Sequence, residues 1–555
     1  MKVCTLTTQT PNNLAVISMM VPVVALLCAS ALSMAPQPPL KVAIAGGGVG
    51  GLTAALGMLK AGFDVTLYEK TGKFARFGGP IQFASNALST LKATDERLFE
   101  RVMDKFTFTG TRRCGIKDGL RADGNFRMTP VSDPRYLVDE TIPADWYLEF
   151  PLKQCADFFQ LPYTGVINRP DLQEILLDEC RQIKPDFLIN GAKVVSYSNT
   201  ADGVTFELGD GERVDADVLI GSDGIWSAVR AQMYDEGDIK GMSADGLTQQ
   251  GCPYSGYTVF AGEFVPERLE DFGDYFECGY KVYIGPGKYF VTSDVGEGRV
   301  QWYSFLALPP GTKRADDSWE GGASSDEQGA DVISYLLNLH EGWTDEIRYV
   351  LESTPSAAVE QRDLYDRWPE FFRSWSDDSV VLIGDAVHPM MPNLGQGGGM
   401  AIEDAYELTK ALEGAVEAAG GRTPPPEEIR EVLQGFYKKR VGRVAGVSLL
   451  SRLASDLIIN FFDTPWSPHD EKGKGPLAYL TFFWKPLLQN FVFPLQFLFL
   501  YSYHPTGSMG DLPKQLEAAW RESHRVSATA AFEKARTEGQ AVAAPSFFAA
   551  VNSPE

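Results

Sequence analysis

The sequence lacks the residue patterns that metal sites and disulfide frameworks require. Its seven cysteines form no Cys-x-x-Cys pair, and its five histidines are isolated from one another. Metal centres need ligands at short, recognisable spacings, so we predict no metal site. We expect the five cysteines in the body of the chain to be reduced, buried thiols. No Ser/His/Asp or Cys/His constellation stands out, which argues against a protein nucleophile.

Positive charge is also scarce. The 50 Lys and Arg residues face 73 Asp and Glu residues, for a formal net charge of −23. Nucleic-acid binding needs a basic face, so we predict no nucleic-acid partner. The 44% apolar and 22% charged composition is typical of a globular protein, and 555 residues suffice for two or three domains. Residues 436–504 depart from this balance, with eight basic residues against four acidic ones.

The first 63 residues contain no Asp or Glu. The apolar run 21–32 is too short to span a bilayer but is typical of a signal sequence, and it leads into Ala29-Ser30-Ala31. This junction resembles the bipartite plastid leaders of algae with secondary plastids, except that Leu32 stands where an aromatic residue usually follows. We therefore expect a removable leader over residues 1–39 and a plastid location. The alternative is a disordered or membrane-anchoring tail.

Glycine is concentrated in two segments, and the first has the pattern of a dinucleotide-binding turn. We expect a buried strand over 40–45, a helix over 52–61 and a second strand over 63–68. The glycines between the first strand and the helix are spaced G-x-G-x-x-G. In this strand-turn-helix context the spacing predicts a dinucleotide site.

Each glycine of this motif has its own physical role. Gly46 permits the tight turn, Gly48 lets the backbone approach a pyrophosphate, and Gly51 lets helix and strand pack closely. The pyrophosphate would lie at the helix N-terminus, where unpaired N–H groups favour negative charge. Glu69 ends the second strand and is placed to accept hydrogen bonds from the adenosine ribose. The fold alone does not choose between NAD and FAD.

The second glycine-rich segment, residues 379–408, favours FAD. A buried strand over 380–383 ends at Gly384-Asp385, and Asp385 can bind the ribityl hydroxyl groups. A helix is expected over about 400–419, and backbone donors at its start suit the N1–C2=O edge of a reduced flavin. The residues predicted to contact the flavin there are Pro392, Gly395, Gln396, Gly397 and Gly398. A strand-turn-helix with a glycine hinge is the alternative.

Two shorter segments resemble motifs of the flavin hydroxylases. Residues 214–230, with Asp223-Gly224 followed by Arg230, resemble the DG motif, which contacts both the flavin and the incoming nicotinamide nucleotide. Arg169 immediately precedes a helix expected to begin at Pro170. The resemblance implies that Arg169 lies against the FAD, whereas an isolated arginine before a helix is usually just solvated.

Over roughly residues 40–450 the sequence resembles the zeaxanthin epoxidase family of plants and algae. The resemblance is carried by GFDVTLYEK (62–70), GGPIQFASNALSTLKATDERLFERV (78–102), YSGYTVFAGEFVP (254–266), KYFVTSDVGEGRVQWYSF (288–305) and LIGDAVHPMMPNLGQGGGMAIEDAYEL (382–408). It implies a class A FAD monooxygenase of the xanthophyll cycle in which NADPH reduces the FAD, with ferredoxin as a candidate ultimate electron source. It also implies that the reduced flavin captures O2 as a C4a-hydroperoxide. That species would epoxidise the ring double bond of a 3-hydroxylated carotenoid such as zeaxanthin, antheraxanthin or diatoxanthin.

Two departures from the family leave the individual xanthophyll open. The plant enzymes carry a C-terminal forkhead-associated domain, and nothing after residue 505 resembles it. The acidic insert 315–331 also differs from the family. We expect residues 511–555 to form an Ala-rich helix and a disordered tail.

Aromatic residues mark a substrate region over 231–370. Their alternation at strand spacing predicts a β-sheet over the flavin, lined for an apolar polyene. The predicted pocket residues are Gln82, Tyr289, Trp302 and Tyr303. The alternative is that half or more of the aromatic residues belong to an ordinary core. Because the flavin would perform the chemistry, we predict no catalytic side chain and interpret His388 as structural.

Residues 477–503 are rich in Phe, Leu, Tyr and Trp but contain two prolines and a lysine. Such a segment does not make a clean spanning helix, and we predict that it lies at the surface of the thylakoid membrane. The basic residues of 436–504 would add attraction to an anionic lipid surface. The alternative is a helical pair packed on the FAD-binding domain.

Together these features predict an α/β fold with a Rossmann-like FAD-binding domain of the p-hydroxybenzoate hydroxylase type. Its predicted range is 40–230 and 371–456, with an inserted antiparallel β-sheet substrate domain over 231–370. A helical, lipid-facing region is expected over 457–510. Two rival functions are a hydroxylase of a small soluble aromatic compound and a carotenoid-binding protein without turnover. A saturase or reductase on the same scaffold is a weaker rival.

Overall fold

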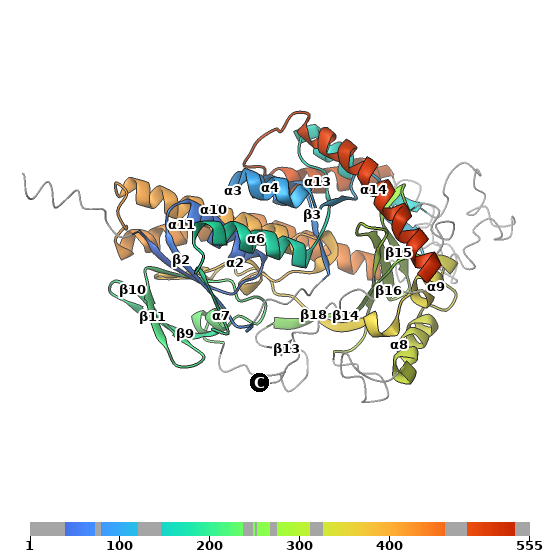
Figure 1. The fold of residues 1–555 in the computed structure, drawn as a ribbon. Coiled ribbons are helices and arrows are strands. Elements are labelled where there is room, and N and C mark those ends of the chain that lie inside the picture. The colour runs from blue at the N-terminus through green and yellow to red at the C-terminus, as the bar shows by residue number, and fades with distance from the viewer. Residues whose placement is uncertain are drawn as a thin grey trace, which may run out of the picture.

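The computed structural model describes residues 39–72, 79–119, 146–236, 248–249, 252–266, 275–310, 326–460 and 486–538. The predicted leader, apart from residue 39, lies outside these ranges, as do residues 311–325, 461–485 and the predicted tail after residue 538. The described chain is built around two larger sheets. Figure 1 shows the smaller of them with β2 at one end of the molecule and the larger, with β15 and β16, at the other.

The smaller sheet forms the dinucleotide-binding half of the molecule. Its strand order is β19-β20-β12-β1-β2-β8, and every neighbouring pair from β20 to β8 is parallel. The strands are β1 (Lys41–Ala45), β2 (Asp64–Glu69), β8 (Leu188–Asn190), β12 (Val218–Gly221), β19 (Ser376–Asp377) and β20 (Val380–Leu382). Continuous apolar runs form the central strands because layers cover both faces of the sheet. Parallel strands end at one edge, so the segments that follow β1, β12 and β20 lie side by side.

Helices cover one face of this sheet and a three-stranded sheet covers the other (Figure 1). The helices are α2 (Val49–Lys60), α6 (Arg169–Ile183), α10 (Gly397–Ala418) and the long α11 (Pro426–Asn460). The small sheet is β9 (Val194–Thr200), β10 (Gly203–Leu208) and β11 (Arg213–Ala216). Glycine allows α2 and α10 to pack closely, since a Cβ atom at Gly57 would lie 3.0 Å from Thr409 Oγ1. Residues 419–425, which include two glycines and two prolines, separate α10 from α11.

The larger sheet has eight strands in the order β13-β14-β17-β16-β15-β5-β6, with β18 also paired to β14. They are β5 (Arg113–Asp118), β6 (Trp146–Glu149), β13 (Thr248–Gln249), β14 (Cys252–Phe264), β15 (Cys278–Gly285), β16 (Lys288–Asp294), β17 (Val300–Leu306) and β18 (Glu360–Tyr365). All pairs are antiparallel except β15 with β5. The predicted substrate range therefore needs one change, because β5 and β6 come from residues assigned to the FAD-binding domain.

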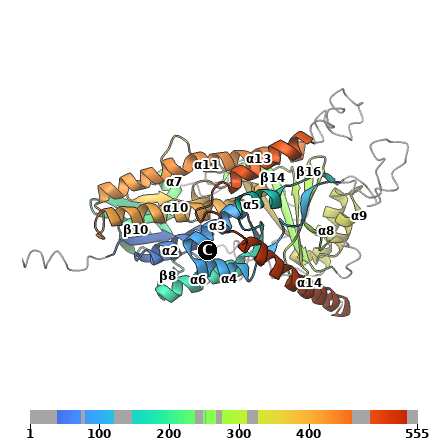
Figure 2. The same cartoon turned by 90° about the horizontal axis from the view of Figure 1, so that it is seen from above.

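The two faces of the larger sheet meet different partners. One face packs on α8 (Asp326–Leu339), α9 (Asp345–Glu352) and the C-terminal helix α14 (Leu512–Glu538), and Figure 2 shows α8 and α9 beside its strands. Tyr289, Phe305 and Met391 belong to a separate buried apolar cluster at the other face. Met391 lies in the second glycine-rich segment, so this second face is turned toward the predicted flavin loop.

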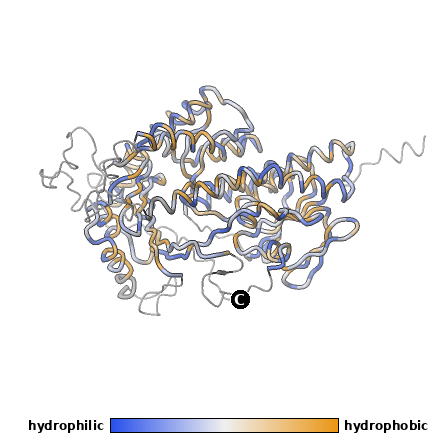
Figure 3. Tube along the Cα trace, turned by 180° about the vertical axis from the view of Figure 1, so that it is seen from behind, coloured by the Kyte–Doolittle hydropathy of each residue, from blue (hydrophilic) through white to orange (hydrophobic). Residues whose placement is uncertain are grey.

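The remaining elements belong to neither of the two larger sheets. They are β3 (Pro80–Phe83), α3 (Ser85–Thr94), α4 (Glu96–Met103), β4 (Thr107–Phe108), α5 (Leu152–Phe159), β7 (Gly165–Asn168), α7 (Ala228–Met233), the π-helix η10 (Leu488–Val492) and α13 (Phe493–Tyr501). Among them, β3, β7 and β4 form a second three-stranded sheet. Within the described ranges, no helix is both long enough and apolar enough to cross a membrane. Figure 3 shows hydrophobic and hydrophilic residues interleaved along the trace.

Candidate functional site

The first glycine-rich turn, between β1 and α2, depends on two glycines that no other residue could replace. Gly46 has φ +100°, and a Cβ atom there would lie 2.5 Å from Ser222 O. A Cβ atom at Gly51 would lie 2.1 Å from Gly46 O. Only glycine adopts this backbone conformation readily and leaves room for such close backbone contacts. The backbone conformation of the turn is therefore determined by contacts within the protein itself.

Gly48 differs from both, because a Cβ atom there would have no protein atom within 4 Å. It is exposed and occupies the N-cap of α2, where no side chain accepts a hydrogen bond from the first helical N–H groups. A helix N-terminus with free donors and open space before it is suited to an anionic group such as a pyrophosphate. The geometry at Gly48 fits the role predicted for it.

Glu69 ends β2, as predicted, and its carboxylate is already anchored. One oxygen accepts a hydrogen bond from Gly47 N at 2.7 Å, and the other accepts from Thr71 N at 3.0 Å and from Thr71 Oγ1 at 3.1 Å. A carboxylate has about four acceptor positions. Glu69 therefore retains about one acceptor position for a ribose hydroxyl group while it holds the glycine turn in place.

Asp223 follows β12 at the same edge of the sheet. Its Oδ2 accepts a hydrogen bond from Ala228 N at 2.8 Å, whereas its Oδ1 is buried without a hydrogen-bond partner among the described residues. Burial raises the pKa of Asp223, against hydrogen bonds from Ser227 and the backbone that lower it. A buried acceptor without a hydrogen-bond donor lowers the stability of the protein unless a ligand donates to it.

Arg230 joins the DG segment to the second glycine-rich motif. Its Nη1 donates to Ile225 O at 2.8 Å and to Ala386 O at 3.1 Å, and the side chain is fully buried. Arg230 thus serves as an internal connector between the two loops.

Asp385 lies on the short 3-10 turn Gly384–Ala386 that follows β20. Its side chain is accessible to solvent, yet the surrounding protein desolvates the carboxylate and raises its pKa, with His388 and Arg169 acting in the opposite sense. The exposed Arg169, at the start of α6, is close enough for its charge to act on Asp385.

The second motif ends at the N-terminus of α10. Pro392 begins a 3-10 turn, and Gly395 follows with φ +60°. A Cβ atom at Gly395 would lie 2.9 Å from Gln82 Oε1, and one at Gly398 would lie 2.6 Å from Ile81 Cδ1. Strand β3 is therefore packed against this turn, with Gln82 beside Gly395.

Gln396 and the adjacent Gly397 face different surroundings. Its side chain is buried, and its Oε1 accepts a hydrogen bond from Asn86 Nδ2 at 3.1 Å. Asp385 Oδ1 lies 3.9 Å from where a Cβ atom at Gly397 would be. The backbone at the start of α10 thus faces Asp385, while the Gln396 side chain points into the protein.

The two glycine-rich motifs meet at Ala401, in the first turns of α10. Cβ atoms built at Gly50 and at Gly384 would lie 3.1 Å and 3.0 Å from Ala401 Cβ. The turns after β1, β12 and β20 also share one edge of the parallel sheet. Residues more than 300 positions apart therefore lie together at one edge of the sheet, where a dinucleotide could extend from Glu69 to α10.

The three predicted pocket residues of the larger sheet, Tyr289, Trp302 and Tyr303, lie on two different faces of it. Tyr289 donates to Asn393 Oδ1 at 2.9 Å and stacks on Phe305 at 4.3 Å, and Tyr303 packs at the same face. Trp302 lies on the opposite face, where its Nε1 donates to Thr354 Oγ1 at 2.8 Å. Neighbouring residues of a strand point to opposite faces, so Trp302 is a core residue and the prediction for it is wrong.

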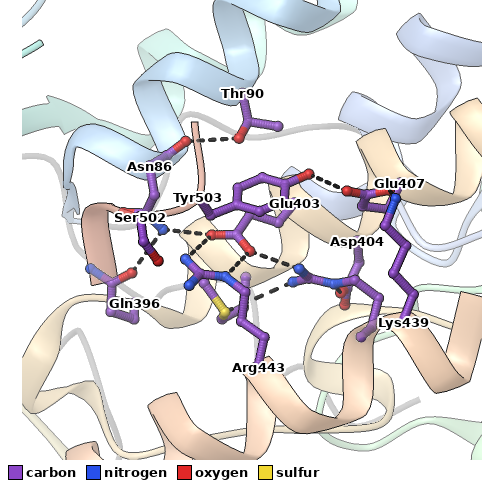
Figure 4. Close-up of polar contacts among 12 residues, drawn as sticks. Asn86, Thr90, Gln396, Glu403, Asp404, Glu407, Lys439, Arg443, Ser502 and Tyr503 are labelled. Atoms are coloured by element: carbon purple, nitrogen blue, oxygen red, sulfur yellow. Dashed lines mark hydrogen bonds and ion pairs between the residues drawn. The ribbon is translucent and has the colours of Figure 1, made fainter. Parts of the chain in front are cut away.

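A buried polar network beneath the second motif could not be located from the sequence (Figure 4). His388 Nε2 lies 2.6 Å from Asp404 Oδ2, and Gly384 N donates to the same oxygen at 3.0 Å. Arg440 Nε donates to Asp404 Oδ1 at 2.7 Å, and its Nη1 to Glu403 Oε2 at 2.8 Å. His388 thus helps to hold the loop that carries Asp385, as expected of a structural residue.

The described residues show no second group of side chains suited to metal or thiol chemistry. No group of three or more His, Cys, Asp or Glu residues within the described ranges could hold a metal ion. The five described cysteines are free and buried, as predicted, and burial raises the pKa of Cys155 to about 11. These thiols are therefore poor nucleophiles.

Comparison with known sequences identifies relatives of this chain. Residues 39–245 and 347–423, about half of the chain, match the family described as "FAD binding domain". The chain is 36% identical over 458 residues to the chloroplastic zeaxanthin epoxidase of Nicotiana plumbaginifolia, which covers 81% of this chain and 59% of that protein. The corresponding protein of Arabidopsis thaliana is 34% identical over 79% of this chain and 57% of its own length. The chain thus spans about three fifths of the length of these relatives.

Solved structures of similar architecture include a protein bound to FAD. HpxO of Klebsiella pneumoniae complexed with FAD and uric acid has a TM-score of 0.60 at 21% identity, covering 84% of this chain and 98% of that one. A salicylate hydroxylase substrate complex has a TM-score of 0.57 at 20% identity with the same coverage. At this identity the likeness shows the fold, which is the FAD-binding monooxygenase fold predicted from the sequence.

Proposed function

We propose, on the premise that this chain belongs to the FAD-binding domain family, that it is an FAD-dependent epoxidase of a 3-hydroxylated carotenoid that uses NADPH and O2. One observation carries the proposal. The open helix N-terminus at Gly48 and the turn at Asp385 form one site at the sheet edge, and an apolar sheet face lies beside its far end. The similarity to zeaxanthin epoxidases supports the choice of substrate class.

The residues present fit FAD. Glu69 and the open turn at Gly48 would hold the adenosine and pyrophosphate groups, and Asp385 with the unmatched oxygen of Asp223 would bind the ribityl chain. The glycine-lined start of α10 would supply backbone donors to the ring. When bound and reduced by NADPH, FAD supplies the activated oxygen. The protein's own tasks are to orient the alkene and to exclude water.

The apolar sheet face beside the second motif is suited to the ring end of a polyene. It is formed by Tyr289, Phe305 and their neighbours, and Met391 and Phe493 pack against it. Stacked aromatic rings offer large, rigid apolar area without an acid or base. This surface favours a carotenoid over a small phenol, which would need polar partners.

A helix at the surface points to lipid as the partner. Leu487, Phe491, Leu495 and Phe499, four residues apart along η10 and α13, are 40%, 61%, 65% and 39% exposed and form what we call the apolar stripe. Residues at this spacing lie on one helix face, and a contiguous exposed apolar face marks an interaction site. The other side of the helix reaches the cluster with Met391 through Phe493. Lipid bound to the stripe would therefore lie beside the site for a lipid-soluble substrate, at the thylakoid surface of a plastid.

Charges placed on the apolar stripe are expected to release the protein from lipid. In the double variant Phe491→Asp/Leu495→Asp, two exposed apolar side chains, each worth roughly 1.5–3 kcal/mol when fully buried, become charged. Co-sedimentation with anionic vesicles should fall at least tenfold while bound FAD is unchanged. Phe372→Asp is the control, since Phe372 is fully exposed on a loop before β19. Equal sedimentation of the double variant and the control would contradict a lipid-binding stripe.

The proposed substrate class is tested by what stimulates NADPH oxidation. Purified protein with FAD is expected to oxidise NADPH several-fold faster with a 3-hydroxylated carotenoid in vesicles than with empty vesicles, and to be unaffected by soluble phenols. Stimulation by a phenol alone would favour the rival hydroxylase. Protein that binds carotenoid but no flavin would favour a binding protein without turnover.

A further inference from the structure

Arg443, on α11, connects two parts of the molecule that have separate tasks. Its Nε and Nη2 donate to the two carboxylate oxygens of Glu403 at 2.6 Å and 2.7 Å. The same guanidinium donates to Phe499 O at 3.2 Å and to Leu500 O at 2.9 Å. Four hydrogen bonds thus join one side chain both to α10 and to the last turn of α13.

On one side of Arg443, contacts run from Glu403 to the start of α10. Glu403 is fully buried, and Asn86 Nδ2 donates to its Oε1 at 2.7 Å. The same Asn86 nitrogen donates to Gln396 Oε1 at 3.1 Å, so Arg443, Glu403, Asn86 and Gln396 form a continuous chain of contacts (Figure 4). Gln396 is the N-cap of α10, where the flavin ring is expected.

On the other side of Arg443, contacts run to the apolar stripe. Phe499, whose carbonyl Arg443 binds, is the last residue of the stripe, and the guanidinium lies 5.7 Å from its ring. A Cβ atom at Gly446, one turn further along α11, would lie 3.0 Å from Phe499 Cζ. The C-terminal end of α13 therefore has little freedom to move without moving Arg443.

We infer that Arg443 is a positioning residue that couples the lipid-facing helix α13 to the flavin-holding turn at Gln396. The inference rests on the proposed function for its two ligands, FAD and lipid. Lipid bound to the stripe would change the position or mobility of α13, and the fork on Glu403 would transmit this change to Asn86 and Gln396. Coupling between two binding sites is reciprocal, so bound FAD would also alter lipid affinity.

Arginine is suited to this task in a way that lysine is not. A planar guanidinium can bind a carboxylate with two parallel bonds and still donate to two carbonyl groups, whereas an ammonium group has three donors on one atom. Arg440 also binds Glu403. Glu403 therefore keeps one cationic partner when Arg443 is replaced, and Arg443→Lys additionally keeps the charge. These variants are expected to fold.

The matched control is Tyr503→Phe. The Tyr503 hydroxyl donates to Glu407 Oε1 at 2.7 Å, which is a second link from the C-terminal segment to α10. No hydrogen bond joins Tyr503 to Glu403, Asn86 or Gln396 within the described network. A general loosening of the C-terminal segment would affect both variants, whereas the specific coupling would be lost only with Arg443.

The test is the rate of FAD release from the full chain, followed by flavin fluorescence, with and without anionic phospholipid vesicles. We expect vesicles to change this rate roughly fivefold or more in the wild type and in Tyr503→Phe. Arg443→Lys and Arg443→Gln should bind both FAD and vesicles yet show a change of less than about twofold. Two results would overturn the coupling but not the proposed function. One is that vesicles change the rate of FAD release in both Arg443 variants as much as in the wild type. The other is that vesicles do not change this rate in a wild type that binds both ligands. A wild type that binds no FAD or no vesicles would overturn the proposed function and the coupling with it.

Discussion

Replacement of Gly48 by valine is expected to abolish FAD binding while the apoprotein keeps its wild-type unfolding temperature. Gly48 has φ −70° and ψ −179°, an extended conformation that any residue adopts, and a Cβ atom there meets no protein atom within 4 Å. The new side chain would instead occupy the space before the N-terminus of α2, where the pyrophosphate is expected. A loss of affinity of roughly a hundredfold or more, about 2.7 kcal/mol, should follow.

The contrast with Gly51→Ala makes this result specific. A Cβ atom at Gly51 would lie 2.1 Å from Gly46 O, so the chain itself must shift. Gly51→Ala is therefore expected to lower the unfolding temperature of the apoprotein as well as FAD affinity. Titration of apoprotein with FAD and thermal unfolding without FAD separate the two effects. Wild-type FAD affinity in Gly48→Val would mean that no dinucleotide lies at this turn.

Replacement of Arg440 by methionine is expected to destabilise the protein by roughly 3–5 kcal/mol, because removal of one partner leaves buried charge uncompensated. Arg440 is fully buried between Glu403 and Asp404. Lys439→Met is the matched control on the same helix, since Lys439 is exposed and its partner Glu407 also accepts a hydrogen bond from Tyr503. That change should cost less than about 1 kcal/mol. Equilibrium unfolding of both variants in denaturant gives the comparison.

The same network predicts how stability depends on pH. Burial alone would raise the pKa of Asp404, but His388 and Arg440 lower it to about 2, below its ordinary value of 3.8. A carboxylate with a lowered pKa contributes stability above its unfolded-state pKa and loses that contribution as pH falls through the folded-state value. The contribution of Asp404 is therefore complete above about pH 4 and lost toward pH 2. Arg440→Met should lose less of its remaining stability across that interval, and an unchanged acid sensitivity would contradict this assignment.

The parts of the site that could be predicted from sequence depend on local geometry. Gly46, Gly48 and Gly51 lie between a strand and a helix. This local order determines the role of each glycine, and it does not depend on the rest of the fold. Asp385 could be placed because it follows a buried strand, and parallel strands end at one edge. These residues lie where the motifs put them.

The parts that could not be predicted depend on contacts between distant segments. A strand pattern shows that Trp302 and Tyr303 lie on opposite faces of the sheet, but it does not show which of the two faces meets the flavin half. Strand β5 lies in the larger sheet because it pairs with β15, more than 150 residues away. The partners of Glu403 come from α3 and α11, and no spacing within one helix reveals them.

The described part of the C-terminal segment, residues 486–503, has one buried side and one exposed side. Phe497, Leu500 and Tyr501 are buried against the main core, as the packed-helix alternative requires. The apolar stripe on the other side is exposed, as an interfacial helix requires. A helix that is apolar all round has no polar face to distinguish these cases from sequence.

The most direct test of the account is the origin of the oxygen in the product. Protein loaded with FAD would be given NADPH, isotope-labelled O2 and a 3-hydroxylated carotenoid in vesicles, and the products would be analysed by mass. The account predicts one labelled oxygen atom per epoxidised ring, with none in the absence of NADPH. Carotenoid recovered unchanged from flavin-loaded protein that oxidises NADPH, or a product whose oxygen comes from water, would contradict it.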